Sequence, residues 1–189
     1  VASGDAGIQV LDVSVPNGIL TMGRHDTPGS AVSVAMSGSY AYVSDNQAGL
    51  RIIDISNPAA PVEVGSVPTA GNAYDVDFAG EFLFLAETTS YAGDPIGGGL
   101  RVMDISNPIS PIEVGYYPSS RVQRVVVEGD YAYVSDWFWM GILDISDPTE
   151  PVLKGEYQST PAVIRDVFVK SNRAYLTMNS PSGLLVLDV

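Results

Sequence analysis

Short runs in which apolar and polar residues alternate fill almost the whole chain, and glycines and prolines separate them. A representative run at 73–80 (AYDVDFAG) alternates and then turns at Gly80 into a second run at 81–87 (EFLFLAE). Alternation on both sides of a tight glycine turn is typical of a β-hairpin. Because no window shows a sustained helical period with capping signals, the pattern predicts an all-β protein with essentially no helix.

One phrase recurs along the chain. It reads GIQVLDVS at 7–14, GLRIIDIS at 49–56, GLRVMDIS at 99–106, MGILDIS at 140–146 and GLLVLDV at 183–189. Its aspartates are separated by 42, 50, 40 and 44 residues, which gives a unit of about 42 residues. An aromatic and a glycine position recur with a similar spacing. The recurring positions are Asp12, Asp54, Asp104, Asp144 and Asp188; Tyr42, Phe84, Tyr133 and Tyr175; and Gly23, Gly65, Gly115 and Gly155.

Each complete unit contains four predicted strands. A third strand such as 99–106 follows the hairpin after a loop, and a turn with two prolines leads to a fourth strand such as 111–117 (PIEVGYY). Proline cannot donate a hydrogen bond to a strand ladder, so the prolines mark strand boundaries. One unit buries too little apolar surface to fold alone. Four-stranded antiparallel sheets stacked around an axis supply the missing core, which predicts a β-propeller.

A parallel β-helix and a β-sandwich are the alternative folds. A β-helix favours coils of about 20–30 residues and has no tight hairpins. A sandwich does not repeat as regularly as this chain does. The spacing and the hairpins therefore favour the propeller.

The strand count predicts three complete blades with partial blades at both ends. The beginning supplies a third and a fourth strand, and the end supplies a first, a second and a third strand; these lie at 7–13, 19–23, 162–169, 173–178 and 183–189. The total of 17 strands exceeds the 16 or so that a closed four-bladed ring needs. We therefore expect one propeller domain, 1–189, or a segment of a larger propeller with at least five blades. The units lie at 7–30, 31–72, 73–120, 121–161 and 162–189.

The recurring phrase resembles the repeat of the LVIVD family. The segments LRIIDISNP at 50–58, LRVMDISNP at 100–108 and ILDISDP at 142–148 carry this resemblance. It implies a propeller on bacterial or archaeal proteins that are secreted or bound to the cell surface, often beside anchoring or adhesion segments. The first unit departs from the pattern at Ser14-Val15-Pro16, and RAYLTM at 173–178 lacks the acid that ends the second strand elsewhere.

The charge and the composition exclude several functions. Lys and Arg total 9 against 22 Asp and Glu, and the resulting formal charge of −13 repels nucleic acids and anionic membranes. Without cysteine, the chain forms no disulfide, thiolate nucleophile or Cys-ligated zinc site. Its apolar runs are too short for direct membrane insertion. We expect an extracellular or cell-surface location, with the export signal outside this chain.

The recurrent acids predict a structural role, because a catalytic group is needed once and a scaffold group in every blade. Asp12, Asp54, Asp104 and Asp144 each precede a turn whose backbone amides a carboxylate can accept from. Asp45, Glu87 and Asp136 end second strands, and we expect them to brace the following loop. No EF-hand-like calcium loop is present, so Ca²⁺ has no supporting motif and neither metal nor cofactor is predicted. Asp75 and Asp77 lie on one side of their strand and point toward a central channel.

Function is expected where the chain departs from its own repeat. The loop 87–99 is about eight residues longer than its counterparts and contains Tyr91 and Asp94. The same loop of the next unit carries Trp137, Phe138, Trp139 and Met140. These loops share a rim with the crossings between units, where His25 and Arg121 lie. The rings predict a site for a protein or glycan partner, and the alternative is local packing, with Phe138 and Met140 facing away from the two tryptophans.

An enzyme and an assembly subunit are the other functions considered. The one histidine, His25, adjoins Asp26, and no G-x-S-x-G motif occurs. A hydrolase or lyase site would need channel acids together with Arg124 or Arg165. The motifs therefore predict a non-enzymatic binding or adhesion module with no catalytic residue. A structural subunit that joins neighbouring chains through its rim or edge strands is the alternative.

Overall fold

The protein is all-β throughout the part that the structure describes. This computed structural model describes residues 1–15, 17–89, 98–119, 122–179 and 183–189. Its secondary structure consists of strands and turns, so the all-β prediction is confirmed. In these residues no helix is long and apolar enough to cross a membrane.

The strands form five sheets, which we number as blades 1 to 5. Blade 1 contains β1 (Ile8–Asp12) and β2 (Leu20–His25). Blade 2 contains β3 (Ser33–Ser37), β4 (Tyr40–Ser44), β5 (Leu50–Asp54) and β6 (Val62–Val67). Blade 3 contains β7 (Asn72–Ala79), β8 (Phe82–Thr88), β9 (Gly99–Asp104) and β10 (Ile112–Pro118). Blade 4 contains β11 (Arg124–Glu128), β12 (Tyr131–Ser135), β13 (Trp139–Asp144) and β14 (Val152–Gln158), and blade 5 contains β15 (Val163–Val169), β16 (Arg173–Asn179) and β17 (Gly183–Asp188).

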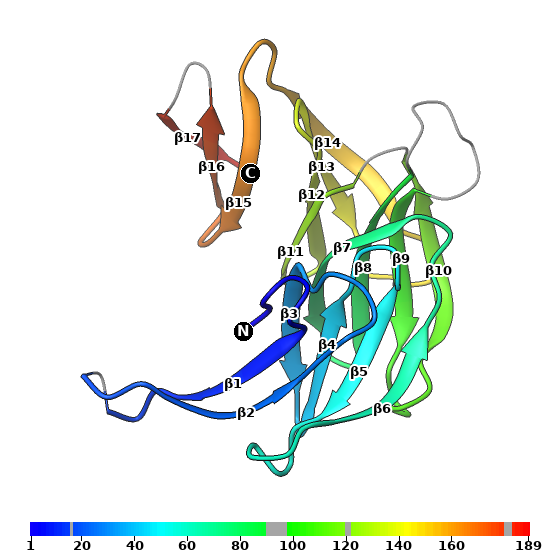
Figure 1. Ribbon diagram of the computed structural model, residues 1–189. Helices are drawn as coiled ribbons and strands as arrows, with labels where there is room; N and C mark the ends of the chain where they lie inside the picture. Colours follow the sequence, from blue (N-terminus) through cyan, green and yellow to red (C-terminus); the bar gives the residue numbers. More distant parts are fainter. Residues whose placement is uncertain (16, 90–97, 120–121, 180–182) are drawn as a thin grey trace.

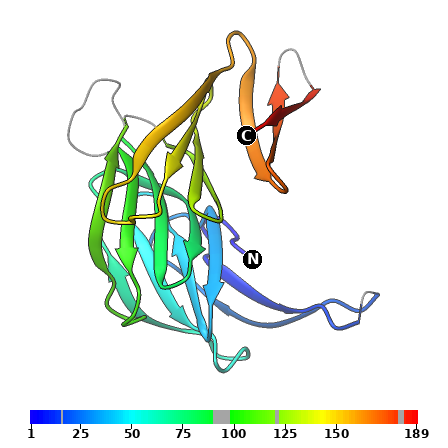
Figure 2. The same ribbon diagram turned by 180° about the vertical axis from the view of Figure 1, so that it is seen from behind.

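The blades are arranged as the strand count predicted. Blades 2, 3 and 4 each have four antiparallel strands in sequence order, and the partial blades stand at the two ends of an open arc (Figures 1 and 2). The first strands β3, β7, β11 and β15 contact one another in turn. Four-stranded antiparallel blades with their first strands in contact are neither a β-helix nor a sandwich. The fold is that of a β-propeller, and the sheets do not close into a ring.

The hydrophobic core lies between blades. Tyr42 and Leu50 of blade 2 pack with Val76 and Leu83 of blade 3. A second cluster joins blades 3 and 4, a third joins blades 4 and 5, and a fourth joins blades 1 and 2. Each blade therefore covers the apolar face of its neighbour, which is how small units acquire a shared core.

The recurrent glycine of the fourth strand marks a close contact between blades. A Cβ on Gly23 would lie 2.4 Å from the Pro58 carbonyl oxygen of blade 2. At Gly65 the corresponding atom is the Ile109 carbonyl oxygen at 2.4 Å, and at Gly115 it is the Pro148 carbonyl oxygen at 2.2 Å. In each case the proline-containing turn of the next blade rests on the glycine. We call each of these positions a turn seat.

The recurrent aspartate of the third strand fixes the turn that occupies a seat. Asp54 Oδ1 accepts a hydrogen bond from the Ser56 amide (2.8 Å), and Asp104 Oδ1 accepts one from the Ser106 amide (2.7 Å). The same bond occurs at Asp12 and Asp144. Because these bonds stabilise the ionised form, they lower the pKa of all four carboxyls.

Blade 1 contains a fragment of a second strand that the motif analysis did not identify. The Val1 amino group donates to the Gln9 carbonyl (2.8 Å), and the Gln9 amide donates to the Val1 carbonyl (2.9 Å). Gly4 then bridges Ala31 in the same way that Asn46 bridges Ala73 in blade 2. The signal is present in the sequence, since VASGDAGIQVLD at 1–12 matches VSDNQAGLRIID at 43–54.

Candidate functional site

The turn between β12 and β13, together with the first residue of β13, carries both tryptophans of the chain. It comprises residues 136–139, and we call it the aromatic turn. The Trp137 carbonyl accepts a hydrogen bond from the Ile164 amide (2.7 Å), and the Phe138 carbonyl accepts one from the Ser159 amide (2.7 Å). Both donors lie in or next to the crossing from β14 to β15, so this turn and that crossing share one rim.

The backbone of the aromatic turn is also fixed from within. Asp136 Oδ1 accepts hydrogen bonds from the Phe138 amide (2.6 Å) and the Trp139 amide (2.7 Å). The Asp136 amide donates to the Trp139 carbonyl (2.9 Å). These bonds, together with the two from Ser159 and Ile164, order the turn before any partner arrives.

Trp139 and Met140 point into the protein. Met140 is 1% exposed and belongs to the core between blades 4 and 5. Trp139 is half-buried beside the core between blades 3 and 4, and its Nε1 donates to Glu156 Oε2 (2.8 Å). Its ring covers Gly141, where a Cβ would lie 2.3 Å from Trp139 Cη2. Met140 therefore adds no surface for a partner, which corrects its place among the candidate contact residues.

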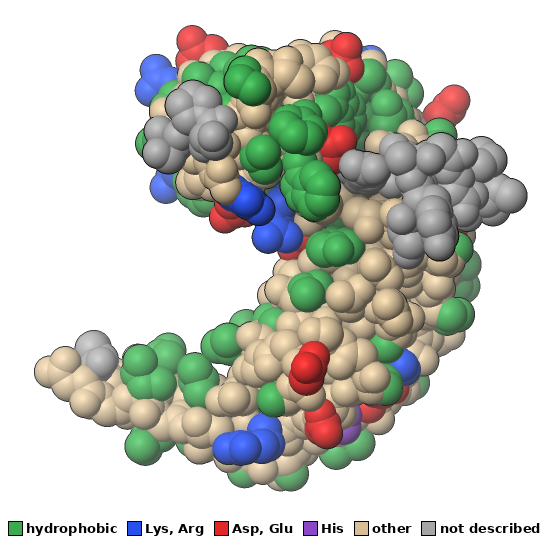
Figure 3. Space-filling view, turned by 45° about the horizontal axis from the view of Figure 1, so that its top comes forward, with side chains coloured by type: hydrophobic (Ala, Val, Ile, Leu, Met, Phe, Trp, Pro, Cys, Tyr) green, Lys and Arg blue, Asp and Glu red, His purple; other side chains and the backbone are tan. Residues whose placement is uncertain are grey.

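Trp137 and Phe138 form the exposed part of the aromatic turn. Their exposed fractions are 44% and 39%. The expected alternation, with Phe138 and Met140 on one side, does not describe them, because residues of a tight turn do not follow the two-residue period of a strand. Figure 3 shows hydrophobic side chains gathered on the upper part of the molecule, beside Lys and Arg side chains.

Of the other four candidate contact residues, one lies in the described structure. Tyr91, Asp94 and Arg121 lie outside the described residues. His25 ends β2 in blade 1, and its Nε2 is 4.0 Å from Glu63 Oε2 of blade 2. It therefore belongs to the contact between the first two blades.

The acids that end β4 and β8 are buried and hold the crossing into their own blade. Asp45, which is 0% exposed, accepts hydrogen bonds from Thr27 Oγ1 (2.6 Å) and the Gly29 amide (2.8 Å). Glu87 is 2% exposed and accepts from the Gly71 amide. Burial raises the pKa of Glu87, and its hydrogen bond to Gly71 partly offsets this effect.

The channel acids Asp75 and Asp77 connect the first strands of neighbouring blades. Asp75 accepts hydrogen bonds from Ser33 Oγ of blade 2 (2.6 Å) and from the Val125 amide of blade 4 (3.1 Å). Asp77 accepts one from the Val127 amide (2.7 Å). Burial raises the pKa of Asp75. Both carboxylates therefore bind amides on the strand edge of β11 that a sheet partner would otherwise satisfy.

Repeat alignment shows one polar position that runs through all first strands. Ser33, Asp75, Arg124 and Asp166 face equivalent second-strand residues. Arg124 Nε is 3.5 Å from Asp166 Oδ1. This row was not identified from the sequence, although comparison of the units at this position would have found it. It joins blades through the hydrogen bond from Ser33 to Asp75 and through the opposite charges of Arg124 and Asp166.

In the described residues, no group of three or more His, Asp or Glu side chains is placed to hold a metal ion. The acids instead accept hydrogen bonds from the backbone and from hydroxyls. The aromatic turn on the rim combines exposed rings with a backbone that hydrogen bonds hold in place.

Four-stranded antiparallel blades in an arc, with a rim of loops and crossings, define a protein of the β-propeller class. The LVIVD repeat family model matches residues 28–69, 70–118 and 120–159. The chain therefore belongs to the LVIVD-repeat family. No curated protein matches the chain.

Solved structures with low sequence identity share the fold. The computationally designed protein Ika8 superposes with a TM-score of 0.74 at 9% identity, over 100% of this chain and 54% of that one. The designed protein Ika4 gives 0.67 at 10% identity, over 86% and 93%. The periplasmic gluconolactonase PpgL of Pseudomonas aeruginosa gives 0.75 at 10% identity, over 91% and 57%. This chain thus spans about half the length of two of these structures.

Proposed function

We propose that the chain is a non-enzymatic module of an extracellular or cell-surface protein, and that it recognises a protein or carbohydrate through its rim. Trp137 and Phe138 are the central contact residues. The observation that supports this proposal is that their side chains are exposed while hydrogen bonds fix the backbone beneath them. The location follows from what the LVIVD resemblance implies.

Aromatic side chains on a pre-ordered backbone are suited to recognition for two reasons. Their rings supply a large apolar contact area, and a ring face also stacks on the apolar face of a sugar. Because the backbone of the turn is already ordered, the conformational entropy lost on binding is only that of two side chains with two rotatable bonds each. Truncation of such rings typically costs more than about 1 kcal/mol of binding free energy.

The net charge narrows the kind of partner. A formal charge of −13 disfavours polyanions such as nucleic acids and sulfated polysaccharides. Neutral glycans and neutral or basic protein surfaces remain the partners to test.

The test compares the unmodified chain with Trp137→Ala and Phe138→Ala on a neutral-glycan array and on immobilised basic and neutral proteins. We expect one ligand class to bind, and each substitution to weaken binding at least about tenfold. The melting temperature should stay within about 2 °C, because neither ring belongs to the core. The control is Tyr131→Ala, which removes a ring of similar exposure, 42%, from the opposite end of β12.

The outcomes separate recognition from local packing. If both substitutions lower the melting temperature strongly and leave binding intact, the rings are packing elements and the proposal fails. If Tyr131→Ala weakens binding as much as Trp137→Ala does, the contact does not lie on this rim.

The second candidate function is that of a subunit in a surface assembly. Large apolar side chains are exposed on the partial blades, including Leu20 at 62%, Phe168 at 58% and Leu184 at 63%. Concentration-dependent sedimentation that Trp137→Ala leaves unchanged would favour this candidate.

A further inference from the structure

The blades differ in whether the acid of the fourth strand meets a cation. In blade 2, Arg51 Nη1 donates to Glu63 Oε1 (3.2 Å), and in blade 3, Arg101 Nε donates to Glu113 Oε2 (2.6 Å). Both arginines lie on the third strand and both glutamates on the fourth strand of their blade. Each of these blades therefore neutralises its own acid with a guanidinium.

Blade 4 keeps an acid on its fourth strand and lacks the guanidinium. The position of Arg101 is taken by Gly141, and Glu156 lies opposite Gly141 on the neighbouring strand. The Trp139 ring covers Gly141, and Trp139 Nε1 donates to Glu156 Oε2 (2.8 Å). Within the described part of the chain, Glu156 forms no ion pair.

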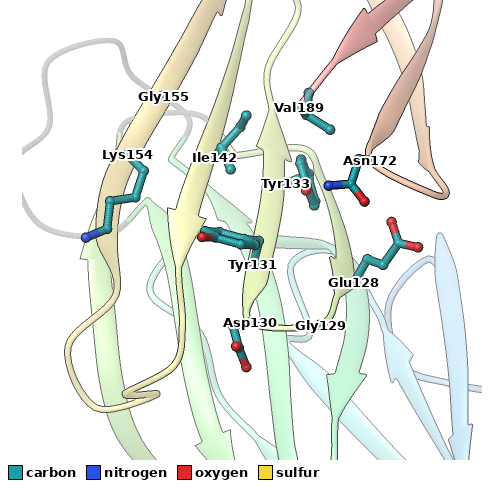
Figure 4. Close-up of a pocket in the computed structure, with 10 residues that line it drawn as sticks. All are labelled: Glu128, Gly129, Asp130, Tyr131, Tyr133, Ile142, Lys154, Gly155, Asn172 and Val189. Carbon is teal, nitrogen blue, oxygen red and sulfur yellow. The ribbon is translucent and has the colours of Figure 1, made fainter.

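The one cation of β14 is used elsewhere. Lys154 Nζ lies 3.2 Å from Asp144 Oδ2. Figure 4 shows Lys154 beside Gly155, next to a pocket of about 530 Å³, with its amino group directed toward the end of the blade that carries Asp130. The rim with the aromatic turn is at the opposite end. Lys154 therefore leaves the charge of Glu156 uncompensated.

Aromatic rings lie near Glu156 from both sides of the junction between blades 3 and 4. Tyr117 of blade 3 and Trp139 of blade 4 are half-buried and pack against the same core. Burial raises the pKa of the Tyr117 hydroxyl, and the negative charge of Glu156 raises it further. The Tyr117 hydroxyl is therefore within electrostatic range of Glu156. The exposed rings of Trp137 and Phe138 continue this surface along the aromatic turn.

A carboxylate beside aromatic rings is a favourable place for a cation. The face of a tryptophan or tyrosine ring attracts an ammonium or guanidinium group, by about 0.5–1 kcal/mol at an exposed site. A carboxylate adds a charge-assisted hydrogen bond. The formal charge of −13 attracts basic partners to the protein as a whole.

We propose that the rim between blades 3 and 4 binds an arginine or lysine side chain of a basic partner protein. Glu156 pairs with the cation, Trp139 and Tyr117 provide the rings beside it, and the aromatic turn contacts the surrounding residues of the partner. Arginine should bind more tightly than lysine, because a guanidinium stacks on a ring and donates hydrogen bonds at the same time. This inference rests on the proposed function, since it names the partner class of the same rim.

Three labelled peptides test the charge preference. The probe is GSGRGRGSG with tetramethylrhodamine at its N-terminus, and the other two peptides carry Gln or Glu in place of both Arg. We expect saturable binding of the arginine peptide by fluorescence anisotropy in about 0.15 M salt, where charges beyond about 8 Å are largely screened. The glutamine peptide should bind at least about tenfold more weakly, and the glutamate peptide should not bind.

Glu156→Gln is the decisive variant. The amide oxygen of Gln still accepts the hydrogen bond from Trp139 Nε1, so we expect an unchanged melting temperature. Affinity for the arginine peptide should fall at least about tenfold, a change of about 1.4 kcal/mol. Glu150→Gln is the matched control, because it removes the same charge from an exposed acid in the turn between β13 and β14, at the other end of blade 4. It should change the affinity less than about twofold.

Three results would overturn the inference. If the arginine peptide does not bind, the rim holds no cation site. If Glu150→Gln weakens binding as much as Glu156→Gln does, the attraction is due to net charge alone. If the glutamate peptide binds and Arg165→Gln abolishes this binding, the rim has the opposite preference, since Arg165 is exposed on β15 next to Ile164, whose amide contacts the aromatic turn.

Failure of this inference is distinguishable from failure of the proposed function. If neutral glycans bind, Trp137→Ala abolishes that binding and the arginine peptide does not bind, the rim recognises carbohydrate. The proposed function then stands, and the inference of a basic partner is wrong. If Trp137→Ala and Phe138→Ala leave all binding intact, the proposed function itself is wrong.

Discussion

The second strands of blades 3 and 4 end in acids that do different things. In blade 3, Glu87 reaches the Gly71 amide in the crossing that leads into the blade, and Arg101 of the third strand lies 3.6 Å from it. In blade 4, Asp136 instead accepts hydrogen bonds from amides of its own turn, at Phe138 and Trp139. The same repeat position thus fixes the crossing between blades in one case and the backbone of the aromatic turn in the other.

The third strand changes together with the second. The position of Arg101 in blade 3 is taken by Gly141 in blade 4, as the strand registers show. The absence of a side chain there lets the Trp139 ring lie over the strand. Two linked departures from the repeat therefore replace an ion pair by an aromatic ring. A site on a repeat protein is found by such linked departures more readily than by any single unusual residue.

The largest effect should come from removal of an acid that holds the crossing into its own blade, such as Asp45. Asp45→Ala leaves the buried Thr27 hydroxyl and the Gly29 amide without an acceptor, so we expect the free energy of unfolding to fall by about 3 kcal/mol. Asp136 is the acid at the same repeat position in blade 4, where it binds amides of the aromatic turn. Asp136→Ala should lower the free energy of unfolding by about 1 kcal/mol only, because water can reach the exposed turn. Urea unfolding followed by circular dichroism measures both.

Equal costs for these two substitutions would break the comparison. They would mean that the acid at the end of the second strand stabilises every blade to the same degree. In that case the aromatic turn would be as much a part of the scaffold as the crossings are.

Most of the fold was predictable because its signals are local. Each hairpin has its own glycine, and each third strand ends at an aspartate followed by a turn, so the strands were placed close to their observed bounds. The curvature of the arc was not predictable, since it depends on how the side chains of one blade pack on the next, as between Phe84 and Val125. The pairing of Val1 with Gln9 was missed, although it was readable by aligning the first unit with the second.

The candidate site was predictable in outline only. Four consecutive large apolar residues in a loop identified the rim, but their periodicity assigned the wrong faces, because Trp137 and Phe138 lie in a turn and Met140 lies in a strand. The position of the Trp139 ring depends on the side chain that Gly141 lacks. That relation becomes visible only when the blades are superposed.

The second prediction tests the position of that ring. Gly141→Ala places a Cβ only 2.3 Å from the present position of Trp139 Cη2. Because this distance is far shorter than a van der Waals contact, the ring must move. We expect a loss of about 1–2 kcal/mol in the free energy of unfolding. The emission of Trp139 should shift to longer wavelength as its ring enters water, measured in a Trp137→Phe background.

The control for this prediction is Gly155→Ala on the adjacent strand β14. Its nearest neighbour among the described residues is Ile142 Cδ1 at 3.7 Å, so the melting temperature and emission should stay unchanged. An unshifted emission maximum for Gly141→Ala would contradict the view that the missing side chain positions the ring.

The smallest effect concerns pH, and it extends the comparison to the first strands, where blade 3 has Asp75 and blade 4 has Arg124. Burial raises the pKa of Asp75, and the hydrogen bonds from Ser33 and Val125, together with the charge of Arg124, only partly offset this effect. The folded protein therefore keeps the Asp75 proton to a higher pH than the unfolded chain does. As pH falls through the raised pKa toward the ordinary value of about 3.9, Asp75 protonates first in the folded state, and its contribution to stability increases.

Comparison with Asp75→Asn isolates this contribution, because the other carboxyls cancel in the difference. We expect the melting temperature of the unmodified chain, minus that of Asp75→Asn, to rise as pH is lowered from about 7 to about 4. Asp104→Asn should give the opposite slope when pH is lowered further, from about 4 toward about 2, since hydrogen bonds from Ser106 lower the pKa of Asp104 and its stabilisation is lost on protonation. Slopes of the same sign for the two variants would show that burial does not determine the pKa of Asp75. The carboxyl on the first strand of blade 3 would then titrate like the carboxyl in the turn after its third strand.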